Sequence, residues 1–192
     1  MGKSYFTASA VQNVQHGEDF YLIEGDFQRD DRQEQILCSL KKGQKKLMKH
    51  NGKPYERLAD HIGKYPMVLI SPADRDLIVE GSETRRKFLD SAIAQADREY
   101  LELLLRYNRT LLQRNTLLKQ MAEHNQFSTE TLSIYDQQLA PLGQLLYQKR
   151  QTFMEDFLPI FQYQYAYIAG GKEQVTLGYQ SQLHQSSLAS LL

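Results

Sequence analysis

The sequence predicts an α+β fold in which a β-rich N-terminal part is followed by a long helical part. Three observations carry this prediction. Between about residues 19 and 50, short stretches of alternating apolar and polar residues are separated by turn sequences, as in an antiparallel sheet. From residue 82 onward, leucines recur at helical spacing over two long stretches. Between the two patterns stands Pro66–Asp90, an apolar run followed by a polar turn.

Charge and cysteine content narrow the function classes. The 192 residues include 23 basic and 23 acidic side chains, so no overall charge attracts the chain to nucleic acid or to a membrane. The one cysteine, Cys38, cannot form an internal disulfide, and a buried thiol in a reducing compartment is expected. No apolar run has membrane-spanning length, and no secretion signal follows Met1. We therefore expect a cytoplasmic protein with no membrane partner.

The β-rich part reads as an antiparallel meander. Asn51-Gly52 predicts a tight turn, because both residues tolerate positive φ. Pro54 cannot extend a central strand and is placed to start a short helix over Tyr55–Ile62. The strands are expected over Asp19–Gln28, Glu34–Leu40 and Lys45–His50.

Five lysines cluster around the turn before the third expected strand and on that strand. A solvated edge, on which lysines prevent edge-to-edge pairing, is favoured over a surface that follows phosphates. The five are Lys41, Lys42, Lys45, Lys46 and Lys49.

The residues do not assemble a recognisable catalytic motif. Gly2-Lys3-Ser4 matches the end of the phosphate-binding loop GxxxxGK[ST], but only Met1 precedes it, so we expect no phosphate-binding role for Lys3. The five histidines do not have zinc-ligand spacing, and no serine or cysteine nucleophile motif is present. Asp74 and Asp76 lie in a turn, where capping explains them better than acid–base catalysis. The residues therefore indicate a two-part α+β scaffold that binds a partner, and they do not indicate a complete enzyme.

Pro66–Asp90 is expected to join the two parts. Met67–Ile70 predicts a short buried strand, and Ser71-Pro72 with Asp74 predicts a capped single turn. Gly81 then gives a hinge, and Ser82 is the expected N-cap of the first long helix.

The helical part predicts a pair of long antiparallel helices. Asp97 can cap one helix, and the other is expected from about Thr129 towards Gln164, with a kink at Pro141. Antiparallel packing buries both leucine stripes. After these helices, Gln174–Tyr179 alternates like a returning strand.

Two sets of polar or aromatic residues on these helices are predicted to be structural. Asn108 and Asn115 fall on or beside the leucine stripe, where they would fix the register between helices. Tyr163, Tyr165 and Tyr167 could stack on bases, but a place in the core is favoured.

Basic side chains concentrate between Gly81 and Gln120, where eight basic residues face five acidic ones. A solvated helix face with pairs such as Glu102–Arg106 is one interpretation, and contact with DNA phosphates is the other. The candidate residues for DNA or interface contact are Arg85, Arg86, Arg106, Arg109, Arg114 and Lys119.

Several motifs in order resemble the RecF family of bacterial recombination and repair ATPases, of the ABC/SMC-like class. Lys49-His50-Asn51-Gly52-Lys53-Pro54 is similar to a family motif containing Val-Asn-Gly-Lys-Pro. Ser71-Pro72-Ala73-Asp74 is similar to Ser-Pro-Glu-Asp, and Arg85-Arg86-Lys87-Phe88-Leu89-Asp90 to Arg-Arg-x-Phe-Leu-Asp. Tyr107-Asn108-Arg109, Gln113-Arg114-Asn115 and Gly170-Gly171 extend the resemblance to nearly the whole chain.

The resemblance implies an ABC-type ATPase head with a helical arm. It places residues 1–80 in the head (lobe I), residues 81–168 in the arm (lobe II), and residues 169–192 on the return towards the head. It implies a full-length protein that binds ATP and Mg²⁺, dimerises on ATP and binds DNA at duplex–single-strand junctions. It also implies roles with RecO and RecR in loading RecA at gaps, in DNA replication, recombination and the SOS response.

The family's nucleotide-binding motifs are not found in these residues, so no bound cofactor is expected for them alone. By analogy with ABC-type ATPases, Ser71 and Asp74 are candidates for sensing nucleotide in the full-length protein. Two alternatives remain open. One is a helical scaffold for protein interaction, and the other is the head of an SMC-like chromosome-organising ATPase.

Overall fold

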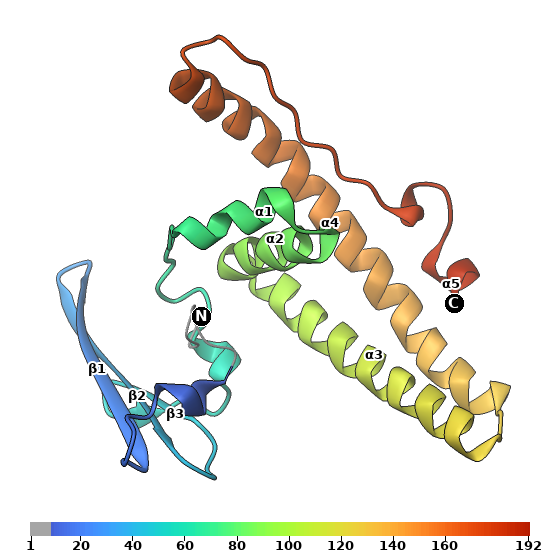
Figure 1. Ribbon diagram of the computed structural model, residues 1–192, viewed down its shortest axis with the longest axis horizontal. Helices are drawn as coiled ribbons and strands as arrows, with labels where there is room; N and C mark the ends of the chain where they lie inside the picture. The colour runs from blue at the N-terminus through green and yellow to red at the C-terminus, as the bar shows by residue number, and fades with distance from the viewer. Residues whose placement is uncertain (1–8) are drawn as a thin grey trace. The chain divides into compact units, whose positions relative to one another are not determined.

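The computed structural model describes residues 9–192 and divides the chain into two compact units, Met1–Leu69 and Ile70–Leu192. A four-stranded antiparallel sheet forms the centre of the first unit, and long helices form most of the second (Figure 1). The predicted α+β class, antiparallel sheet and long helix pair are therefore confirmed. The boundary between the units falls inside Pro66–Asp90. The Gly2-Lys3-Ser4 sequence lies outside the described residues.

The sheet is a meander whose strands follow one another in chain order. Asn51 and Gly52 have φ of 49° and 78°, which confirms the predicted tight turn. The backbone amide of Asn51 donates to the Gln35 carbonyl at 2.8 Å, and the side-chain oxygen of Asn51 accepts from the Gln35 amide at 2.7 Å. The strands are β1 (Phe20–Arg29), β2 (Arg32–Lys41), β3 (Leu47–His50) and β4 (Lys53–Pro54).

One face of the sheet carries the core of this unit. Ile36 and Leu40 of β2 and Met48 of β3 are buried there, and Val14, just after the 3₁₀ turn η1 (Ala10–Asn13), is buried too. Cys38 lies on the same face between them but is only half-buried, so the prediction of a buried thiol is not met in full.

Two predictions after the third strand are wrong. Tyr55–Ile62 does not form a helix; only the 3₁₀ turn η2 (Leu58–His61) forms, after Pro54 has joined the edge strand β4. Met67–Ile70 is not a buried strand: Val68 and Ile70 are each 85 % exposed. The sheet of the described residues ends at β4 and does not include this run, so nothing in it covers these side chains.

The predicted capped turn is confirmed. Ser71 Oγ accepts the Ala73 amide, and the Asp74 carboxylate accepts the Ser71 amide at 2.6 Å, at the start of η3 (Pro72–Arg75). The short helix α1 (Asp76–Val79) follows. The predicted cap at Ser82 is wrong by one residue, because Gly81 occupies the N-cap position in extended conformation.

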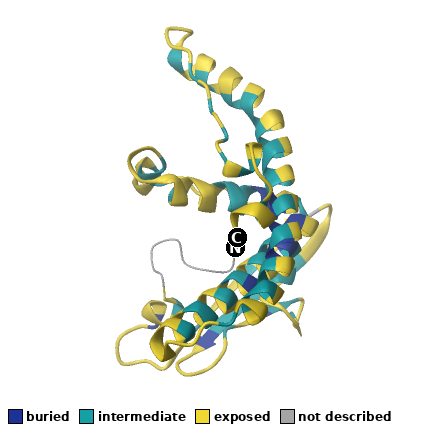
Figure 2. Cartoon of the chain, turned by 90° about the vertical axis from the view of Figure 1, so that its right-hand side faces the viewer, coloured by how far each residue is buried: buried dark blue, intermediate teal, exposed yellow. Residues whose placement is uncertain are grey.

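The helical unit is built on α2 (Ser82–Ala96), α3 (Arg98–His124) and α4 (Thr129–Ala169). Asp97 caps α3 as predicted, by accepting the Tyr100 amide at 2.9 Å. α3 and α4 are antiparallel, and buried residues recur where the two helices run together (Figure 2). The predicted leucine stripes are buried in part: Leu101, Leu139 and Leu146 are buried, whereas Leu105 and Leu112 are 43 % and 68 % exposed. α4 continues through Pro141, where a kink was expected, and through Pro159.

The last residues return along α4 without forming the predicted strand over Gln174–Tyr179. Side chains of α4 hold them instead: the Gln162 amide donates to the Val175 carbonyl at 3.3 Å, and the Tyr165 hydroxyl donates to Glu173 at 2.8 Å. The segment ends in η4 (Gln182–His184) and α5 (Leu188–Leu191). Leu188 lies where a side chain on Gly143 would be, so Gly143 leaves the space in which α5 packs.

One polar cluster connects α2, α3 and α4. Arg150 of α4 donates two hydrogen bonds to the Asp90 carboxylate of α2, from Nε at 2.8 Å and from one terminal nitrogen at 2.9 Å. The same Nε also donates to the Tyr100 hydroxyl of α3 at 2.9 Å. The Tyr100 hydroxyl donates a hydrogen bond to the Asp90 carboxylate. Burial and the hydrogen bond to Asp90 raise the pKa of Tyr100 far above its usual value, so the hydroxyl stays protonated.

Arg150→Met tests how much this cluster contributes. The change leaves the Asp90 carboxylate, 18 % exposed, without its cation, and we expect a loss of about 3 to 5 kcal/mol in the free energy of unfolding. Lys149→Met is the matched control, because its ion pairs are more exposed and are expected to contribute about 1 kcal/mol or less. Urea unfolding of both variants measures the difference, and equal losses would contradict it.

Candidate nucleic-acid interface

The structure separates the six candidate basic residues into two groups. Arg85, Arg86 and Arg114 make hydrogen bonds within the helical unit. Arg85 donates to the carbonyls of Leu77 and Glu80 at 3.0 Å, and Arg86 donates to Ser82 Oγ at 2.9 Å. Both guanidinium groups remain exposed, with further N–H donors available.

Arg114 has a structural role. Its Nε donates to the Asp136 carboxylate of α4, and the two side chains are only 14 % and 25 % exposed. A half-buried ion pair between antiparallel helices fixes their register. Arg114 is thus the least available of the six to an external phosphate.

Arg106, Arg109 and Lys119 form the second group, on the exposed side of α3. The ion pair expected between Glu102 and Arg106 is not formed, because Glu102 pairs with Arg98 at 3.0 Å. Arg106 and Lys119 are 13 positions apart, which is about 20 Å along the helix axis and about 140° around it, so the three cations are spread over the exposed half of the helix.

We call this surface the outer face of α3. It comprises Arg106, Arg109 and Lys119 together with the exposed side chains of Asn108, Leu112 and Asn115.

Asn108 and Asn115 were predicted to fix helix register, and this prediction is wrong. Both are exposed, and they recur with Leu105, Leu112 and Lys119 at spacings of three and four residues, which places them on one side of the helix. Both side-chain amides therefore share the side of α3 that carries Lys119. Amide and guanidinium groups are the donors that commonly bind phosphate and sugar oxygens.

Ser71 and Asp74, the candidate nucleotide sensors, lie together in the capped turn before α1. In this structure their side-chain oxygens accept hydrogen bonds from backbone amides of the turn itself. A change in the Asp74 carboxylate would therefore act first on the backbone of this turn.

Metal-ligand clusters and membrane-spanning helices are both absent from the described residues. Within residues 9–192, no group of three or more His, Cys, Asp or Glu side chains is arranged to hold a metal ion. In the same range, no helix combines the length and the apolar character needed to cross a membrane.

The chain is similar to bacterial repair proteins over its whole length, although no protein-family model matches it. The DNA replication and repair protein RecF of Flavobacterium johnsoniae is 53 % identical over 191 residues, which cover 100 % of this chain and 53 % of that protein. RecF of Bacteroides fragilis strain ATCC 25285 is 44 % identical, and the match covers 94 % of this chain and 48 % of that protein. The chain thus spans about half the length of these curated relatives.

Solved structures agree with this result. A structure of the recombination mediator protein RecF with ATP, described in the RecFOR pathway, superposes with a TM-score of 0.86 at 27 % identity, covering 99 % of this chain and 53 % of that one. A second RecF structure, described as RecF-ATPrS, superposes with a TM-score of 0.81 at 29 % identity. The match covers 88 % of this chain and 46 % of that one. Similarity in both sequence and fold identifies the chain as a segment of the RecF family.

Proposed function

We propose that this segment supplies a DNA-contacting arm to a RecF-type repair and replication protein, and that the outer face of α3 is the main contact. The observation that carries the proposal is the absence of partners for Arg106, Arg109 and Lys119 within the described chain, where neighbouring cations are neutralised. Lys87 pairs with Glu83, Arg98 with Glu102, and Arg114 with Asp136.

Cations with no partner in the protein are suited to phosphate, because binding then releases counterions without breaking an ion pair. Arg85 and Arg86 on α2 are proposed as additional contacts through the N–H groups that their internal bonds leave unused. Arg114 is the sixth candidate, and its ion pair to Asp136 makes its contribution indirect, through the position of α3.

For the full-length protein, the family membership supports ATP-dependent binding at junctions between duplex and single-stranded DNA. In this proposal residues 1–80 belong to the ATPase head and residues 81–168 to its arm, while residues 169–192 return towards the head. ATP and Mg²⁺ would be held mainly by residues of the full-length protein that do not belong to this chain. Such a protein would dimerise on ATP in the cytoplasm and act with RecO and RecR to load RecA at gaps.

The triple variant R106Q/R109Q/K119Q tests the DNA contact in the full-length protein. Each phosphate contact contributes about −0.9 to the slope of log K against log salt, so losing three contacts should reduce the magnitude of the slope by about 2 to 3. Fluorescence anisotropy with a junction DNA, from low to moderate salt, measures the slope.

The matched control for this test is Arg98→Gln compared with Arg109→Gln. Both lie on α3 and remove one charge, but Glu102 already neutralises Arg98. Only Arg109→Gln should reduce the slope. An unchanged slope in the triple variant, or equal effects of the two single changes, would refute the assignment.

Asp74→Asn tests the proposed nucleotide-sensing turn. The change weakens the carboxylate's hydrogen bond to the Ser71 amide and should uncouple ATP binding from dimerisation in the full-length protein. Sedimentation with and without ATP, next to a separate ATP-binding measurement, reads out both steps. Asp76→Asn is the control from the same turn, and an Asp74→Asn protein that still dimerises on ATP would end the proposal.

A further inference from the structure

A second exposed surface lies on the distal half of α4, and its chemistry is opposite to that of the outer face of α3. Ile160, Tyr163 and Tyr167 are 59 %, 72 % and 81 % exposed, so the predicted place of these tyrosines in the core is wrong for two of the three. With Asp156, they recur at spacings of three and four residues and so lie along one side of the helix. We call these four residues the distal α4 face.

The returning C-terminal segment leaves this face uncovered. That segment bonds to Gln162 and Tyr165, which point to a different side of α4 from Tyr163 and Tyr167. Phe153, Phe157, Phe161 and Tyr165 form a row of ring contacts, with centroids 5.7 to 6.1 Å apart, so these aromatic side chains already have partners. Exposed residues recur along this half of the helix (Figure 2).

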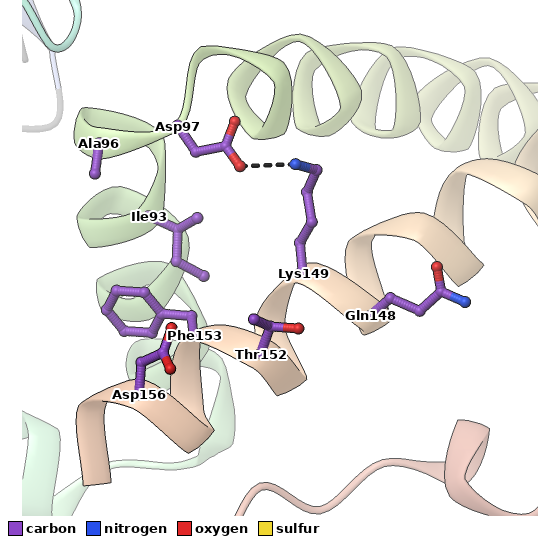
Figure 3. A pocket seen from close by; sticks show the side chains of 8 residues that line it. All are labelled: Ile93, Ala96, Asp97, Gln148, Lys149, Thr152, Phe153 and Asp156. Carbon is purple, nitrogen blue, oxygen red and sulfur yellow. Dashed lines mark hydrogen bonds and ion pairs between the residues drawn. The ribbon is translucent and has the colours of Figure 1, made fainter. Parts of the chain in front are cut away.

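At its N-terminal end the distal α4 face continues into a hollow of about 390 Å³ beside the junction of α2 and α3 (Figure 3). Ile93 and Ala96 of α2 and Phe153 of α4 give it an apolar lining. Asp156 stands at the same hollow and forms no ion pair among the described residues. The hollow and the face together offer apolar anchoring sites along one line.

Carboxylates surround this surface. Lys149 at the hollow is bonded to Asp97 and Glu99, each at 2.8 Å, and these bonds raise the pKa of Lys149. Burial acts to raise the pKa of Asp97, but hydrogen bonds from Lys149 and the Tyr100 amide together outweigh it and keep the pKa below its usual value. Beyond Arg150, the chain has two acidic residues, Glu155 and Asp156, and no basic residue before Lys172.

This charge selects among possible occupants. A nucleic acid would bring its phosphates against Asp156, and Lys149 at the hollow is already paired with Asp97 and Glu99. A second copy of the chain, related by twofold symmetry, would bring the same carboxylates together. Exposed tyrosines with an isoleucine are typical anchors of protein interfaces, and an acidic rim complements basic side chains.

We propose that the distal α4 face and the adjoining hollow bind an amphipathic protein segment that carries aliphatic and basic side chains. The aliphatic side chains occupy the hollow and contact Ile160, Tyr163 and Tyr167. The basic side chains pair with Asp156 and its neighbour Glu155. This inference is independent of the DNA contact proposed for the outer face of α3, because it concerns a different helix and the opposite charge.

The test uses the full-length protein and two designed helical peptides, one of leucine and lysine and one of leucine and glutamate in the same pattern. Fluorescence anisotropy at physiological salt should show binding of the lysine peptide in preference to its glutamate twin. Y163S/Y167S should weaken that binding about tenfold, which corresponds to about 1.4 kcal/mol. Asp156→Lys should weaken binding of the lysine peptide and strengthen binding of the glutamate peptide.

Leu112→Ser, on the outer face of α3, is the control because its side chain is 68 % exposed and lies on the other helix. It should leave peptide binding unchanged, and thermal unfolding checks that all variants fold. The proposal is overturned if the full-length protein does not bind the lysine peptide or if Asp156→Lys leaves the preference unchanged. Weaker DNA binding by Y163S/Y167S would assign the face to nucleic acid, and loss of self-association would assign it to a second copy.

Discussion

The arrangement of the helical unit depends on the bonds between Arg150, Asp90 and Tyr100. The guanidinium of Arg150 meets a carboxylate from α2 and a hydroxyl from α3, so one side chain of α4 fixes both other helices. Because removing one member would leave a half-buried charge without its partner, the cluster tolerates one arrangement of the three helices. This arrangement sets which sides of α3 and α4 remain exposed.

The two exposed sides have different chemistry. The outer face of α3 carries amides and basic residues to which no acidic side chain within residues 9–192 is bonded, whereas the distal α4 face carries tyrosines, an isoleucine and a carboxylate. A net charge of zero for the whole chain conceals this separation. An arm with one face for nucleic acid and one for protein could connect a repair protein to both kinds of partner.

Local signals in the sequence predicted local features well. Asn51-Gly52 gave the tight turn, Asp97 gave a helix cap, and Ser71 with Asp74 gave the capped turn, because each depends on residues close in the chain. Features that depend on distant residues were missed. The partner of Arg114 lies 22 positions away, and the burial expected for Met67–Ile70 needs neighbouring strands that the described sheet does not provide. Asn108 and Asn115 share the helical phase of Leu105 and Leu112, which the leucine pattern had placed in the stripe, so periodicity alone did not predict that this row is exposed.

The central claim is that the outer face of α3, and not the distal α4 face, meets DNA. Hydrogen–deuterium exchange of the full-length protein, with and without a junction DNA, tests it most directly, because bound segments exchange more slowly. We expect slower exchange in peptides covering residues 105–120 and no change in peptides covering residues 156–168. Slower exchange over residues 156–168 with none over residues 105–120 would contradict the claim.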